Sequence, residues 1–302
     1  MKRTLSYTFM LAGLVMSLAA ANSSTLTAMA QTTIAPFRAD FPRPFTCTQG
    51  TLTGTYGMLV KGNILNLPGL PMKQYAAIGL VTFDGYGNFY THKGMVNNNG
   101  ALTPLPDETG TYTLDSDCKG TMIGQGGIYQ IVVSKNGHEY DAVYSPQTGP
   151  FTPTPLVLSG IGKKVEPYEV GPNPLDRARS FYCSMGTIAG TWSVSFEGMT
   201  NDFPPLPPGP FRGVVTLKYD SSGAFTGSNK AVFGGFYIES PQTGQQLYVN
   251  SDCTTAGSGD VSGYGVLVNG GKELLLIGTY PAGINFEDGK GIITTSIGQK
   301  VR

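Results

Sequence analysis

The sequence predicts an all-β protein built from two copies of a small antiparallel β-barrel. Apolar and polar residues alternate with a period of two, as in the segment 51–60, and turn-forming pairs such as Asn136-Gly137 separate the alternating segments. No segment shows a convincing helical period. Each copy offers about seven or eight short strands, which is enough for one sheet to close on itself and remove its edges.

A pair of β-sandwiches is the alternative architecture. Glycines occur frequently inside the predicted strands. Closing a barrel requires sharp local bends, and glycine is the residue that permits them. The barrel is therefore the preferred prediction.

The composition excludes several classes of protein. Lys and Arg number 20 against 20 Asp and Glu, so the chain has no excess of positive charge for a nucleic-acid backbone. Charged residues make up 13%, about half the usual share of roughly 25%. Aromatic residues make up 11%, which supplies ample core material and excludes a disordered chain. A weakly charged globular protein remains.

The first thirty residues predict a secretory signal peptide. Lys2 and Arg3 precede an apolar run at 9–21, and Ala28-Met29-Ala30 places small residues where a signal peptidase cleaves. We expect cleavage after Ala30.

The remaining chain is predicted to be exported and soluble, in the periplasm or outside the cell. Residues 31–46 would form an N-terminal arm ahead of the first barrel. No later segment approaches the roughly 20 consecutive apolar residues of a membrane-spanning helix. We therefore expect neither a membrane span nor a nucleic-acid partner, and the oligomeric state stays open.

Four cysteines agree with export. Cys47 and Cys118 lie 71 positions apart, and Cys183 and Cys253 lie 70 apart. Of the three pairings that four cysteines allow, this near-equal spacing selects Cys47–Cys118 and Cys183–Cys253. A zinc site is the alternative, but no two cysteines are close in sequence and the chain has only two histidines. We expect no metal and no cofactor.

A repeat with an offset of 136 positions organises the chain. Its period is far too long for a solenoid unit and fits one domain. The matching motifs are Cys47 with Cys183, Gly54-Thr55-Tyr56 with Gly190-Thr191-Trp192, and Ile161-Gly162-Lys163-Lys164-Val165 with Ile297-Gly298-Gln299-Lys300-Val301. The predicted copies are 47–166 and 183–302, and the proline-containing stretch 167–182 is the predicted linker.

Several motifs resemble those of known barrel proteins. Gly190-Thr191-Trp192 resembles the Gly-x-Trp signature of lipocalins, and Gly54-Thr55-Tyr56 is its aromatic counterpart. The run from Phe83 to Asn88, followed by Gly110-Thr111-Tyr112-Thr113-Leu114, resembles exported bacterial calycin-like or allene-oxide-cyclase-like barrels, a largely uncharacterised group. The resemblance covers both copies.

The lipocalin resemblance implies roles for particular residues. In lipocalins the tryptophan closes the floor of the barrel and a late basic residue packs on it. Lys164 and Lys300 are the matching positions here, with lysine where the family has arginine. The resemblance also implies a lid between the first and second strands, where each copy carries a proline-rich apolar segment with Leu70 or Leu206 near its centre.

Support for catalysis is weak, and we expect no enzymatic activity. The chain has no Gly-x-Ser-x-Gly motif, and the predicted disulfides consume every cysteine. Glu139 and Glu273 correspond between the copies and are the only acid/base candidates. Inside a barrel such a carboxylate would have a raised pKa. The alternative is an exposed glutamate just past a hairpin turn.

The predicted function is non-enzymatic binding of a small apolar molecule or another extracellular component. Burial of ligand surface in a barrel interior would supply the affinity. The candidate ligand-binding residues are Tyr56, Trp192, Leu70 and Leu206. An isomerase or cyclase of the allene-oxide-cyclase kind, using Glu139 or Glu273, is the second hypothesis. A structural or adhesive envelope protein is the third.

Overall fold

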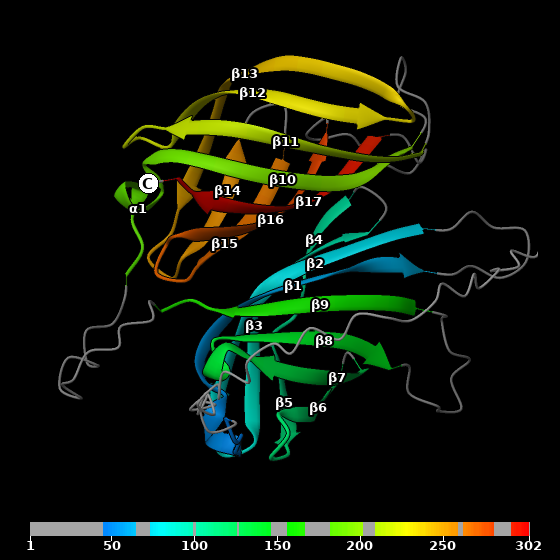
Figure 1. Ribbon diagram of the computed structural model, residues 1–302, viewed down its shortest axis with the longest axis vertical. Coiled ribbons are helices and arrows are strands. Elements are labelled where there is room, and N and C mark those ends of the chain that lie inside the picture. Colours follow the sequence, from blue (N-terminus) through cyan, green and yellow to red (C-terminus); the bar gives the residue numbers. More distant parts are fainter. Residues whose placement is uncertain are drawn as a thin grey trace, which may run out of the picture. The chain divides into compact units, whose positions relative to one another are not determined.

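Strands make up almost the entire fold of the computed structural model (Figure 1). The structure describes residues 45–64, 73–98, 101–125, 127–145, 156–166, 182–201, 209–258, 262–280 and 291–301. These residues belong to one compact unit, Pro44–Arg302. The predicted signal peptide and most of the predicted arm and linker lie outside the described residues.

The first barrel consists of nine antiparallel strands and two short 3-10 helices, η1 (Gln49–Thr51) and η2 (Lys135–Gly137). The strands are β1 (Thr53–Ile64), β2 (Lys73–Asp84), β3 (Asn88–Asn98), β4 (Ala101–Pro104), β5 (Glu108–Leu114), β6 (Lys119–Gly124), β7 (Gly127–Ser134), β8 (Glu139–Ser145) and β9 (Leu156–Lys164). Eight of them close a ring in the order β1-β2-β3-β5-β6-β7-β8-β9. The short β4 pairs with the second half of β3, and β5 pairs with the first half.

The second barrel is a closed ring of eight antiparallel strands, preceded by the four-residue helix α1 (Met185–Ile188). The strands are β10 (Gly190–Asn201), β11 (Gly209–Tyr219), β12 (Ala224–Phe233), β13 (Phe236–Val249), β14 (Thr254–Ser258), β15 (Ser262–Val268), β16 (Glu273–Tyr280) and β17 (Gly291–Lys300). Within the described ranges, each strand pairs only inside its own copy. The prediction of two antiparallel barrels is confirmed, and the sandwich alternative is wrong.

Alternation along the strands decides which side chains enter the first barrel. In β1, Tyr56, Met58 and Val60 are buried in one apolar cluster. In β7, Ile131 and Val133 join the same cluster, whereas Val132 between them is 50% exposed. A shift of one residue in the pairing register would turn these apolar side chains to solvent. The alternation of buried and exposed residues therefore fixes the register of each strand.

Both predicted disulfides are confirmed. Cys47 bonds to Cys118 with 5.0 Å between Cα atoms, and Cys183 bonds to Cys253 with 4.9 Å. Each bond ties the segment before the first strand of a barrel to the turn before β6 or β14. Cross-links that close loops of this size stabilise a fold by up to about 4 kcal/mol.

The two barrels repeat the same contact near the start of their first strands. Trp192 is fully buried and donates a hydrogen bond from Nε1 to the carbonyl of Ile188 at 2.7 Å. Lys300 Nζ lies 5.9 Å from the centroid of the Trp192 ring, and Lys164 Nζ lies 6.0 Å from that of Tyr56. The basic partners implied by the lipocalin resemblance are therefore confirmed as contacts.

The two barrels share a buried apolar contact. Strands β15 and β16 carry consecutive buried residues, so they bury both faces, one toward their own barrel and one toward the first barrel. Val266 and Val268 point at Gly57 of β1, and Asn97 donates a hydrogen bond from Nδ2 to the Gly278 carbonyl at 3.2 Å. A run without alternation is typical of a strand covered on both sides.

No helix in the described part of the chain is both long enough and apolar enough to cross a membrane.

Candidate ligand-binding site

A cavity of about 390 Å³ lies in the first barrel. Its apolar wall comes from strands that alternate into the interior, and it includes Met58, Val60, Val81, Phe89 and Met122. The volume falls within the range of roughly 300–1,000 Å³ that is typical of small-molecule sites. The first barrel therefore has room for a small ligand.

An irregularity in β3 shapes one side of this cavity. Lys93 has a φ of 54°, and the pairing of β2 with β3 shifts register between Ile78 and Leu80. Bulges of this kind bend a strand and re-aim its side chains. Beyond the bulge, β3 leaves β5 and pairs with β4. The connection from Leu105 to Asp107, between β4 and β5, then borders the cavity.

Two tyrosines supply hydroxyl groups to the cavity. Tyr75 and Tyr129 line the cavity, and the ring of Tyr129 packs edge-on against Tyr144 with centroids 5.3 Å apart. Burial raises the pKa of Tyr129, and the nearby Tyr75, Tyr144 and Glu108 raise it further. These phenols stay neutral, so they can both donate and accept hydrogen bonds.

Glu108 places a carboxylate in the same cavity. In β5 the more buried positions alternate with exposed ones, and Glu108 lies on the same face as the buried Tyr112. The carboxylate of Glu108 occupies the space that a Cβ would need at Gly124 of β6. The glycine at 124 thus makes room for the Glu108 carboxylate to lie against the neighbouring strand β6.

His92 and Asp107 stand at the edge of the cavity. The Tyr90 hydroxyl donates a hydrogen bond to Asp107, and the His92 ring stacks on Tyr90 with centroids 5.1 Å apart. His92 Nε2 lies 3.4 Å from Thr82 Oγ1. Burial lowers the pKa of His92, although the charge of Asp107 acts against it. The histidine is therefore neutral at neutral pH and contributes no positive charge.

The two predicted ligand-binding residues that the structure describes, Tyr56 and Trp192, lie outside the cavity of the first barrel. The ring of Tyr56 packs against Phe83 and Tyr140, and its hydroxyl donates a hydrogen bond to the Gly137 carbonyl. Trp192 has the matching place in the second barrel. Leu70 and Leu206 belong to the segments between β1 and β2 and between β10 and β11, outside the described residues. Neither Tyr56 nor Trp192 lines the cavity of the first barrel.

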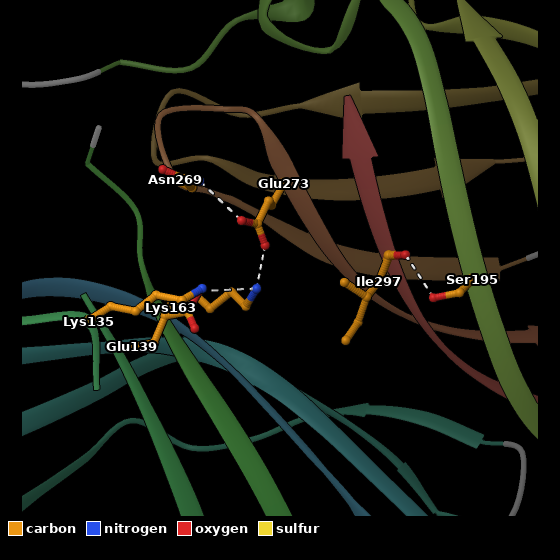
Figure 2. Close-up of polar contacts among 7 residues, drawn as sticks. All are labelled: Lys135, Glu139, Lys163, Ser195, Asn269, Glu273 and Ile297. Atoms are coloured by element: carbon orange, nitrogen blue, oxygen red, sulfur yellow. Dashed lines mark hydrogen bonds and ion pairs between the residues drawn. The ribbon is translucent and has the colours of Figure 1, made fainter. Parts of the chain in front are cut away.

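The two predicted acid/base candidates meet at one lysine (Figure 2). Glu139 of the first barrel and Glu273 of the second both contact Lys163, with Glu139 Oε1 at 3.3 Å from Nζ. Lys135 also pairs with Glu139 at 2.8 Å, and Asn269 donates to Glu273 at 3.1 Å. The two glutamates thus form an ion-pair cluster with Lys163 between the barrels.

The expectation of a raised pKa is wrong for Glu139. Burial acts to raise the pKa of this carboxyl, but the hydrogen bond from Lys135 and the charge of Lys163 outweigh it and lower the pKa. A carboxylate held ionised by two lysines does not have the high proton affinity of a general acid. Neither glutamate lines the cavity.

Sequence reasoning missed Glu108 and Tyr129. Both could be found from alternation alone, since Tyr129 shares a face with Ile131 and Val133. For Glu108 the signal is its even spacing from Tyr112. The bulge at Lys93 leaves no clear signal in the sequence, and the cavity wall on that side depends on it.

Metal ligands do not cluster in the part of the chain that is described: no group of three or more His, Cys, Asp or Glu side chains is placed to hold a metal ion.

Comparisons with known proteins give no family for the chain. No family model matches it. No curated protein matches it either. One similar solved structure is a protein of unknown function from the DUF3598 family of Nostoc punctiforme, with 12% identity and a TM-score of 0.27; the match covers 84% of this chain and 99% of that one.

A second similar structure is an AttH candidate from Nitrosomonas europaea, with 8% identity and a TM-score of 0.28; the match covers 88% of this chain and 98% of that one. Likeness at this level carries no argument about fold or function. The function must therefore be inferred from the geometry of the barrels themselves.

Proposed function

We propose that this protein is an exported, non-enzymatic binding protein that holds a small apolar molecule in the cavity of the first barrel. The observation that supports this most strongly is the cavity of about 390 Å³ with a largely apolar wall. Burial of apolar ligand surface contributes roughly 25 cal/mol per Å², and the hydroxyls of Tyr75 and Tyr129 would orient the ligand.

The predicted floor and lid residues keep their place in this proposal. Tyr56 would support the ligand indirectly by closing the barrel beneath it, and Trp192 would do so in the second copy. Leu70 and Leu206 are proposed as lid contacts on the mouths of the two barrels. The copies would be 47–166 and 183–302, joined by the linker 167–182.

Export is also part of the proposal. Two disulfides fit a chain that folds in an oxidising compartment. A signal peptide at 1–30 and a location in the periplasm or outside the cell agree with them. Membership of the calycin-like group is proposed on the same footing, because two antiparallel eight-stranded rings are consistent with it.

The test is a titration with N-phenyl-1-naphthylamine, an uncharged dye whose fluorescence rises in apolar sites. Wild type should bind it saturably. Ala77→Phe should weaken binding at least about tenfold, because Ala77 is buried and lines the cavity, and the added phenyl ring would occupy space that the dye needs. Val143→Phe is the matched control, since Val143 is 58% exposed on β8.

Ala77→Leu serves as a milder variant, and far-ultraviolet circular dichroism checks that each variant folds. Absence of saturable binding by wild type would contradict the proposal and favour the structural or adhesive envelope role. Equal binding by Ala77→Phe, Ala77→Leu and wild type would place the dye elsewhere and contradict it as well.

One observation favours a second candidate function, acid/base chemistry on a bound molecule. Glu108 brings a carboxylate into the cavity beside Tyr129. An isomerase or cyclase could use such a group, whereas Glu139 and Glu273 lie at the Lys163 cluster. Conversion of a bound compound that Glu108→Gln abolishes without loss of dye binding would support this alternative.

A further inference from the structure

The charged side chains described in the lining of the first barrel's cavity are acidic. Among the described residues that line it, the acidic side chains are Asp107 and Glu108, and none is Lys or Arg. His92 is kept neutral because burial lowers its pKa. Charge in an apolar, poorly solvated site is felt strongly, so a bound anion would be repelled and a bound cation attracted.

Glu108 is the acid whose position is fixed toward the interior. It begins β5 on the face that carries Tyr112, and its carboxylate fills the space beside Gly124. The ring of Phe89 also lies against Gly124 and Gly110, so the acid sits next to an apolar wall. Asp107, in contrast, is exposed and accepts a hydrogen bond from Tyr90.

The neighbours of Glu108 suit a cation in a second way. Tyr75 and Tyr129 line the same cavity, and aromatic faces attract ammonium groups, most strongly where water is excluded. Neutral phenols can also accept a hydrogen bond from an N–H donor. Carboxylate, aromatic faces and apolar wall together form a site for a molecule with an apolar body and one positive end.

We propose that the cavity selects apolar molecules that carry a protonated amine, with Glu108 as the residue that pairs with the ammonium group. This inference rests on the proposed binding function and narrows its ligand class. It excludes fatty acids and other apolar carboxylates as preferred ligands, because their charge has the same sign as that of Glu108.

Three probes with the same chain and different ends test the inference. Decylamine, 1-decanol and decanoate are each used at pH 7, below their aggregation concentrations, to displace N-phenyl-1-naphthylamine from the wild-type protein. Decylamine should bind about tenfold or more tighter than decanol, since a hydrogen bond between charged groups contributes more to affinity than one between neutral groups. Decanoate should bind more weakly than decanol.

Glu108→Gln should remove the preference while keeping the site. The carboxamide has nearly the same shape, so decanol affinity should change less than about twofold, whereas decylamine should lose about tenfold. Glu239→Gln is the matched control, because Glu239 is an exposed acid on β13 of the second barrel. It should leave all three affinities unchanged.

The outcomes separate the two proposals. If none of the probes displaces the dye and the dye itself does not bind, the binding function fails. If decanol displaces the dye but decylamine binds no better, or if decanoate binds best, the binding function stands and the amine preference is wrong. An amine preference that survives in Glu108→Gln would overturn the role of Glu108.

Discussion

Val268 of the second barrel packs directly against Gly57 of the first: a Cβ at Gly57 would lie 2.7 Å from Cγ1 of Val268 and 2.8 Å from Cγ1 of Val266. Both valines are fully buried. The absence of a side chain at residue 57 therefore allows β1 and β15 to approach. This contact makes the stability of one barrel depend on the other.

Gly57→Val should destabilise the protein by about 1–3 kcal/mol, because overpacking a buried contact forces backbone and side chains apart. The measurement is the free energy of unfolding in urea. Ser193→Val is the matched control, since Ser193 occupies the corresponding place in the second copy and is exposed. A Gly57→Val variant as stable as Ser193→Val would show that the barrels do not pack through this contact.

Two buried tyrosines in the core of the first barrel, Tyr56 and Tyr140, should respond oppositely to loss of their hydroxyl. The Tyr56 hydroxyl donates to the Gly137 carbonyl, so Tyr56→Phe should lower the free energy of unfolding by about 1 kcal/mol. The Tyr140 hydroxyl is buried and has no hydrogen-bond partner among the described atoms. Tyr140→Phe should be neutral or stabilising by about 1 kcal/mol. Thermal unfolding of the pair checks both, and the reverse order would contradict the assigned contacts.

Lys163→Met should destabilise the protein by about 2–3 kcal/mol, between the values for exposed and fully buried ion pairs. The substitution leaves the carboxylates of Glu139 and Glu273 together without the cation that separates them. Lys61→Met is the control, because Lys61 also pairs with a glutamate of the second barrel, Glu197, but is exposed. Chemical denaturation should show less than about 1 kcal/mol for Lys61→Met. Equal losses of unfolding free energy in Lys163→Met and Lys61→Met would mean that burial of the Lys163 ion pairs adds nothing to stability.

Acid should weaken the fold partly through Glu139. Its pKa is lowered in the folded protein, so it contributes stability above the ordinary carboxyl pKa of about 4.3 and loses that contribution as the pH falls through the folded value. Wild type should therefore lose stability below about pH 5 more steeply than Glu139→Gln. Unfolding curves between neutral and acidic pH measure this. If the free energy of unfolding fell equally steeply with decreasing pH in wild type and in Glu139→Gln, the role of Glu139 in acid stability would be contradicted.

Local patterns were sufficient for the fold. The alternation around Tyr56 and the matched cysteine spacings predicted the barrels and both disulfides, because these depend on residues whose role is decided by strand period or by loop closure. The lysines that pack on Tyr56 and Trp192 were implied by the lipocalin resemblance. Because the chain contains two copies, the strand alternation and the cysteine spacing each occur twice and support the same prediction.

The contact between the barrels and the cavity depends on long-range packing. The run from Leu274 to Ile277 lacks alternation, which is the one sequence signal that β16 is covered on both faces. Nothing local indicates that Glu139 and Glu273 share Lys163, since Lys163 and Glu273 lie 110 positions apart in the sequence. The cavity wall likewise depends on the bulge at Lys93, a departure from the period that predicts the rest.

Native mass spectrometry of the protein purified from its own host tests the central claim most directly. We expect a bound small molecule that adds to the mass of the wild-type chain and is absent from Ala77→Phe, and the released compound should be apolar. A wild-type chain that carries no bound molecule, or one that Ala77→Phe retains in full, would contradict ligand binding in the first barrel.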